Sequence, residues 1–213
     1  ERYHLMGVTL AAGGALRWWR DVIERGSYEA LDELAAGARP GAEGLLFLPY
    51  LTGERTPHLD PHARGAFVGL TSRHGLGHLT RAVMEGVAFS LRDSIELMAG
   101  LGLDPTEVRI TGGGSRSAFW CQLFADVLGK RVVRAAVDEG PAYGAALLAG
   151  VAVGTFDSVD QACGAIAVPT APFEPRAGER RRYESYYESY RKLYSATRAA
   201  MHELSDLAGR PDT

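Results

Sequence analysis

Three consecutive glycines, Gly112 to Gly114, separate two segments of different character in the stretch RITGGGSRSAFW. The residues before them, EVRIT, are typical of a strand, and Ser115 or Ser117 offers an N-cap for a helix with Trp120 on its apolar face. A turn between a strand and a helix N-terminus lets the backbone approach a ligand closely, and its N–H groups favour anions. The spacing therefore predicts either a nucleotide-binding turn or a plain connection between the two elements.

Two common phosphate-binding motifs do not fit this turn. A P-loop requires Lys followed by Ser or Thr, whereas Lys130 is followed by Arg131 and Lys192 by Leu193. The dinucleotide fingerprint requires a third glycine where this sequence has Ser117, and it requires a carboxylate about 20 residues further on that is absent here. A P-loop is excluded, and a dehydrogenase turn is disfavoured.

The composition describes an ordinary globular protein of 213 residues, with 46% hydrophobic residues, 23% charged residues and a net charge of −3. This charge gives no basic surface for nucleic acid. We also expect no membrane contact and a cytoplasmic location, because no long apolar run or signal pattern occurs. Cys121 and Cys163 lie far apart in the sequence, which is typical of reduced thiols and not of a disulfide framework or a zinc site.

Periodicity and turn residues predict the elements that position the glycine turn. Strands are expected in YHLMGVTL, GLLFLPYL, GAFVGL, EVRIT and KRVVRAAV. Helices are expected in GGALRWWRDVIERG, closing at Gly26, in YEALDELAAGA, from His78 onward, after Ser117, in EGPAYGAALLAGVAVG and in a long C-terminal segment with a stripe of tyrosines. Because strands alternate with helices, the pattern predicts a layered α/β domain.

The polar stretch TGERTPHLDPHARG contains two further candidates. His58 and His62 have the spacing of a metal-binding pair on a helix, but Pro57 and Pro61 disfavour a helix, so we expect no metal site. Glu54 and the arginine after it are interpreted as a buried ion pair that anchors the loop near a cleft.

Three longer segments resemble the C-terminal domain of the FGGY family of carbohydrate kinases. They are GLLFLPYLTGERTPHLDPHARGAFVGLTSRHGLGHLTRAVMEG, TGGGSRSAFWCQLFADVLG and GPAYGAALLAG, in this order. From Gly65 to Glu85 the match to the family signature is position by position, and the resemblance extends over Arg2 to Met201. LPYLTGERTPH and GGGSRS resemble the xylulokinase branch more than the glycerol kinases, which have Asn in place of Ser117.

The resemblance implies an actin-like ATPase domain of ribonuclease H-like topology, with a mixed sheet flanked by helices over residues 1–205 and a frayed tail over 206–213. It implies that this domain holds ATP. Adenine and ribose are expected against Gly112, Gly113, Gly114 and Ser117, and the phosphates near Gly69, Leu70, Thr71 and Ser72. Gly140, at the start of the next helix, is expected to complete the base pocket.

The implied reaction is transfer of the ATP γ-phosphoryl group to a sugar hydroxyl, with O5 of D-xylulose as the favoured acceptor and Mg²⁺ as the metal. The catalytic base, the metal-directing carboxylates and most sugar contacts are expected in an N-terminal domain outside this chain. We therefore assign no catalytic residue here and expect the chain alone to be inactive. The alternatives are a kinase for glycerol, ribulose or gluconate, or a non-catalytic module that binds a nucleotide or a partner. A homodimer through the tyrosine stripe is a further expectation, because some family members are dimers.

Overall fold

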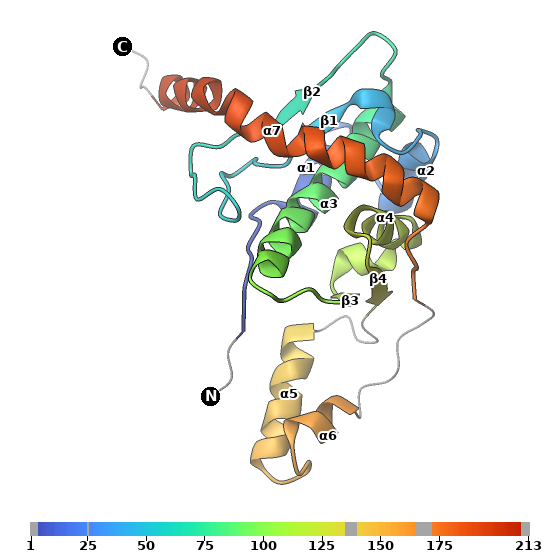
Figure 1. The fold of residues 1–213 in the computed structure, drawn as a ribbon, viewed down its shortest axis with the longest axis vertical. Coiled ribbons are helices and arrows are strands. Elements are labelled where there is room, and N and C mark those ends of the chain that lie inside the picture. The colour runs from blue at the N-terminus through green and yellow to red at the C-terminus, as the bar shows by residue number, and fades with distance from the viewer. Residues whose placement is uncertain (1–3, 25, 135–139, 165–171, 210–213) are drawn as a thin grey trace.

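The computed structural model describes residues 4–24, 26–134, 140–164 and 172–209 (Figure 1). The helices are α1 (Ala12–Val22), α2 (Tyr28–Ala36), α3 (Leu76–Gly100), α4 (Ala118–Leu128), α5 (Gly140–Ala152), α6 (Val159–Gly164) and α7 (Ala177–Ala208), with short 3-10 turns η1 (Ala42–Gly44) and η2 (Gly113–Arg116). The strands are β1 (Leu46–Leu48), β2 (Ala66–Val68), β3 (Glu107–Ile110) and β4 (Arg131–Arg134). In Figure 1, α7 crosses the body of the molecule, while α5 and α6 form a hairpin beside it.

The strands confirm the α/β class and pair in two ways. β1 and β2 are antiparallel, with Leu46 opposite Val68. β3 and β4 are parallel, with Glu107 opposite Arg131, and α4 connects them as the crossover helix. Within the described ranges these pairs are two separate two-stranded sheets. The carboxyl ends of β3 and β4 lie at one edge, and the glycine turn follows β3 there.

The strand predicted at the start of the chain is wrong, because residues 4–9 have no regular secondary structure. No strand pairs with this segment in the described part of the chain. Instead, Val8 N donates to Thr56 Oγ1 at 3.0 Å, and Thr56 N donates to Val8 O at 2.9 Å. The next helix, α1, ends at Val22, short of the predicted stop at Gly26.

The long helices also differ from the predictions in detail. α3 begins at Leu76, two residues before the expected start at His78. α7 continues to Ala208, three residues into the segment predicted to be a tail. The short helix α6 was not predicted. None of the described helices is long and apolar enough to cross a membrane.

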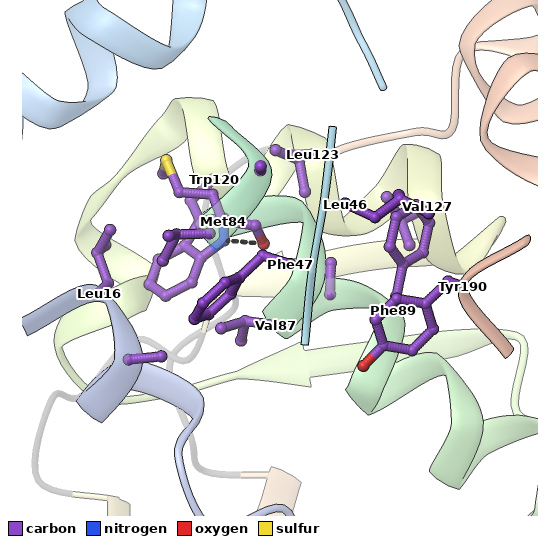
Figure 2. Packing of buried hydrophobic residues seen from close by; sticks show 14 of the residues in the cluster. Leu16, Leu46, Phe47, Met84, Val87, Phe89, Trp120, Leu123, Val127 and Tyr190 are labelled. Carbon is purple, nitrogen blue, oxygen red and sulfur yellow. Dashed lines mark hydrogen bonds between the residues drawn. The ribbon is translucent and has the colours of Figure 1, made fainter. Parts of the chain in front are cut away.

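The hydrophobic core surrounds α3, which is buried over most of its length. Figure 2 shows Trp120 of α4 beside Met84 of α3 and Phe47 of β1. The indole Nε1 of Trp120 donates to Met84 O at 3.2 Å, so the polar end of this large side chain is satisfied inside the core. On the other side of α3, the rings of Phe89 and Tyr190 lie 5.2 Å apart. These contacts fix α4, β1 and α7 around one helix.

The tyrosine stripe of α7 packs on α3 and is largely an internal surface. Tyr183, Tyr187 and Tyr190 are buried. The hydroxyl of Tyr183 donates to Glu85 Oε1 at 2.7 Å, and Arg81 Nε donates to the same oxygen at 2.6 Å. Because burial of a charge is costly unless it is paired and hydrogen-bonded, this network fixes how α7 lies against α3.

Asp93 should make the stability of this interface depend on pH. Burial raises the pKa of its carboxyl to about 6, although Tyr187 donates a hydrogen bond to it at 2.7 Å. The folded protein therefore holds this proton more tightly than the unfolded chain. The resulting contribution to stability is complete below about pH 4 and is lost as the pH rises through about 6.

We expect Asp93→Asn to remove this loss, because the amide oxygen still accepts from Tyr187 and carries no charge. At pH 8 the variant should be about 2 kcal/mol more stable than the wild type, and at pH 4 the two should be similar. Urea unfolding at both pH values measures the difference. An equal pH dependence in the two proteins would contradict the assignment.

Candidate functional site

A cavity of about 670 Å³ lies between α3, the segment that leads into α1, and the β3–α4 unit. Its walls are mainly apolar and come from α3 (Val87, Leu91, Ile95, Met98), β3 (Val108, Ile110) and α4 (Trp120, Phe124, Leu128). The remaining apolar and backbone lining comes from the start of the chain (Gly7, Ala12, Gly13) and from the glycine turn (Thr111, Gly113, Gly114). The cavity is therefore an apolar hollow with bare backbone along its rim.

The predicted glycine turn forms part of this rim. Gly112 has φ of +77°, and its carbonyl oxygen accepts from Ser115 N at 3.0 Å and Ser115 Oγ at 2.7 Å. Gly113 is exposed, and a Cβ added to it or to Gly112 would meet no atom within 4 Å. Gly114 is tighter, since its Cβ would lie 3.2 Å from the Trp120 ring. The turn thus presents open backbone that a flat ligand can approach.

Of the two predicted N-cap candidates, Ser117 and not Ser115 caps α4, because Ser117 Oγ accepts from Trp120 N at 2.8 Å. Its side chain is also hydrogen-bonded with Asp32 of α2. Burial raises the pKa of the Asp32 carboxyl, and the hydrogen bond with Ser117 acts in the opposite direction. Sequence reasoning missed Asp32, because no local signal in α2 indicates that it lies near the start of α4.

The second predicted segment, Gly69 to Ser72, follows β2 and does not line this cavity. Gly69 has φ of +96°, and a Cβ there would lie 2.3 Å from Gly44 O, so the backbone fold itself requires glycine. Leu70 is exposed, and Thr71 N donates to His74 Nδ1 at 2.9 Å in a tight turn. The structure therefore separates this turn from the cavity, and its contact with phosphates stays a prediction.

Gly140 is the first residue of α5. The residues that connect it to β4, 135–139, lie outside the described ranges. Its contribution to a base pocket also stays a prediction.

Sequence reasoning missed the start of α1, where Ala12 and Gly13 line the same cavity as Gly113 and Gly114. This helix has no side-chain cap, and a Cβ added to Gly13 or Gly14 would meet no atom within 4 Å. The first N–H groups of a helix have no intrahelical acceptor. The sequence shows two glycines in the first turn of this helix, but no local pattern indicates that they lie at the same cavity as the turn from Gly112 to Gly114.

The polar groups of the cavity suit binding and include no general base. Ser94 is buried on α3, and its Oγ has no hydrogen-bond partner within the described part of the chain. Arg109 is exposed and pairs with Glu107 at 3.3 Å. No carboxylate or histidine belongs to the lining. Across the described ranges, no three His, Cys, Asp or Glu side chains gather as a metal site, so these residues give no ligand set for Mg²⁺.

The loop after β1 is anchored differently from the prediction. Glu54 is buried, but Arg55 is exposed, so the expected buried ion pair between them is wrong. The Glu54 carboxylate instead accepts from backbone N–H groups and a hydroxyl. His58 stacks on Tyr194 of α7, with ring centroids 3.7 Å apart, and His62 Nδ1 lies 3.1 Å from Ser205 Oγ. These histidines contact α7, and residues 57–62 are not helical.

The chain is similar to known carbohydrate kinases in sequence and in structure. Residues 1–153 match the model of the FGGY family of carbohydrate kinases, C-terminal domain. The xylulose kinase of Staphylococcus epidermidis is 40% identical over 205 residues, which cover 96% of this chain and 41% of that protein. A ligand-bound xylulose kinase from Lactobacillus acidophilus superposes with a TM-score of 0.84 at 30% identity, over 90% of this chain and 39% of that one. A gluconate kinase from the same organism gives 0.83 at 29% identity, over the same shares. The chain thus spans about two fifths of the relatives' length.

Proposed function

The chain belongs to the FGGY family of carbohydrate kinases, in which it corresponds to the C-terminal domain, and from this premise we propose that it is the ATP-binding part of a longer sugar kinase. The observation that carries this proposal is the open glycine turn: Gly113 and Gly114 line the cavity, and a Cβ added to Gly112 or Gly113 would meet no atom within 4 Å. In this proposal, adenine and ribose lie against Gly112 to Gly114 and Ser117. The uncapped start of α1 faces the phosphates, because a helix N-terminus favours negative charge.

D-Xylulose is the proposed acceptor, phosphorylated at O5. The support is the likeness to several xylulose kinases, including those of Staphylococcus epidermidis, Bacillus subtilis and Escherichia coli at 38–40% identity. The likeness in structure to a gluconate kinase keeps gluconate as the alternative acceptor. A C-terminal domain is expected to make few of the sugar contacts. An enzyme assay that compares the acceptors therefore identifies the substrate.

The residues of this chain bind and orient the nucleotide and exclude water from one side of it. Bound Mg²⁺ would neutralise phosphate charge. Its ligands are proposed to lie in the remainder of the enzyme, together with the base that accepts the sugar proton. The apolar interior of the cavity fits protein side chains better than phosphates. We propose that the enzyme's own N-terminal domain covers this interior, and that the enzyme acts in the cytoplasm.

The proposal predicts which acceptor drives ADP release. The enzyme that contains this chain should release ADP from ATP faster with D-xylulose than with glycerol, L-ribulose or gluconate, whereas residues 1–213 alone should release none. A coupled ADP assay with these four acceptors measures the preference. A preference for another acceptor would overturn the assignment of the sugar. If none of the four acceptors supports ADP release, the proposed kinase activity is wrong.

A further inference from the structure

Glu54 is one of the most deeply buried charged residues, with 2% of its surface exposed. Its carboxylate accepts three hydrogen bonds. Oε1 accepts from Leu10 N at 3.1 Å and from Arg55 N at 2.7 Å, and Oε2 accepts from Thr9 Oγ1 at 2.8 Å. Two of these donors belong to the segment directly before α1. A buried carboxylate is retained here only because these donors satisfy it.

Neighbouring contacts hold the same segment from other sides. Thr56 and Val8 exchange two hydrogen bonds, of 2.9 and 3.0 Å. Thr9 Oγ1 lies 3.0 Å from Ser90 Oγ on α3. Gly7 packs so closely on α3 that a Cβ would lie 2.7 Å from the Ser94 side chain. The backbone from Gly7 to Leu10 is therefore held between α3 and the loop after β1. Glu54 accepts hydrogen bonds from two consecutive residues of this segment, Thr9 and Leu10.

The segment from Gly7 to Leu10 leads directly to the cavity. α1 begins at Ala12, two residues after Leu10, and Ala12 and Gly13 line the same cavity as Gly113 and Gly114 of the glycine turn. Ser94 also lines this cavity, and its buried Oγ has no hydrogen-bond partner within the described residues. The far half of α1 is held separately, since Trp19 Nε1 donates to Thr80 Oγ1 at 2.9 Å. The residues that Glu54 holds therefore determine the direction in which the first N–H groups of α1 point.

We infer that Glu54 is a positioning residue for ATP: through Thr9 and Leu10 it sets the direction in which the start of α1 faces the cavity. This inference rests on the proposed function. Glu54 has no contact with the reacting atoms in this account, so its loss should raise the KM for ATP and leave kcat and the KM for the sugar nearly unchanged. A displacement of about 1 Å in a positioning element is enough for large kinetic effects.

The test compares variants of two buried carboxylates on one loop. Glu54→Leu leaves three donors without an acceptor, while Glu54→Gln keeps an amide oxygen for the backbone N–H groups. Asp60→Asn is the matched control, because Asp60 also accepts three hydrogen bonds but from Tyr194, His202 and His62 N, which do not touch the segment before α1. Thr9→Val, with Thr9→Ser as its rescue, is the milder pair in case Glu54→Leu does not fold.

We expect Glu54→Leu to raise the KM for ATP on the order of tenfold in the enzyme that contains this chain. The KM for ATP of Glu54→Gln and of Asp60→Asn should stay within about threefold of the wild-type value. Thr9→Val should raise this KM less than Glu54→Leu but more than Glu54→Gln, and Thr9→Ser should restore the wild-type value. In the same enzyme, hydrogen exchange should rise on the order of tenfold for the amides of residues 8–14 in Glu54→Leu, with little change there in Asp60→Asn.

Two results would overturn the inference. One is faster hydrogen exchange over residues 8–14 in Glu54→Leu together with an unchanged KM for ATP, which would mean that Glu54 holds the segment but does not affect ATP binding. The other is unchanged exchange over these residues. A wild-type enzyme that releases no ADP with any acceptor would instead refute the proposed function, and with it the role toward ATP, while the exchange data would still decide whether Glu54 holds the segment.

Discussion

Replacing Gly86 with alanine is expected to lower the free energy of unfolding by about 3 kcal/mol or more. Gly86 lies in the middle of α3, and an added Cβ would be 2.2 Å from Phe47 O and 3.1 Å from Phe47 C. Both are backbone atoms of β1, so no side-chain rotation can relieve the contact. Alanine favours helix over glycine by only about 1 kcal/mol. The clash therefore outweighs the gain in helix propensity, and α3 and β1 must separate.

Gly100→Ala is the control for this prediction, because it places the same methyl group in the same helix. A Cβ at Gly100 would meet no atom within 4 Å. It should leave stability unchanged or raise it by up to about 1 kcal/mol. Urea unfolding followed by tryptophan fluorescence compares the two variants. Equal midpoints for Gly86→Ala and Gly100→Ala would show that the α3–β1 contact is softer than the structure indicates.

Replacing Gly113 with leucine is expected to raise the KM for ATP on the order of tenfold or more. Gly113 is exposed at the cavity rim, and its backbone φ is not in the left-handed region. A side chain there enters open space, so folding should be preserved. In the proposed site it occupies the volume where adenine lies against the turn. Gly112 would be a poorer choice, since its φ of +77° makes any substitution strained.

Local patterns predicted most of the elements that surround the site. The helix from Leu76 to Gly100 has 3.6-residue periodicity over many turns, and Ser117 caps α4 as its position before the apolar stripe indicated. The segment at residues 4–9 has strand composition but no strand partner in the described ranges, and composition alone carries no information about a partner. The sequence could not distinguish these cases, because pairing is a property of the whole sheet.

The candidate site was predicted in part. The turn from Gly112 to Gly114 was found because a strand, glycines and a cap stand next to one another in the sequence. The start of α1 was missed because it reaches the cavity only through long-range packing, and Glu54 was paired with the wrong neighbour for the same reason. A hydrogen bond between residues 44 or 45 positions apart leaves no local signal.

The most direct test of the account is ATP saturation of the enzyme that contains this chain, measured side by side for wild type, Gly113→Leu and Gly178→Leu. Gly178 lies at the start of α7, and a Cβ there also meets no atom within 4 Å, so it controls for the substitution itself. We expect a raised KM for ATP in Gly113→Leu alone, with an unchanged melting temperature and an unchanged KM for the sugar. Wild-type ATP saturation in Gly113→Leu would contradict the placement of the nucleotide against the glycine turn.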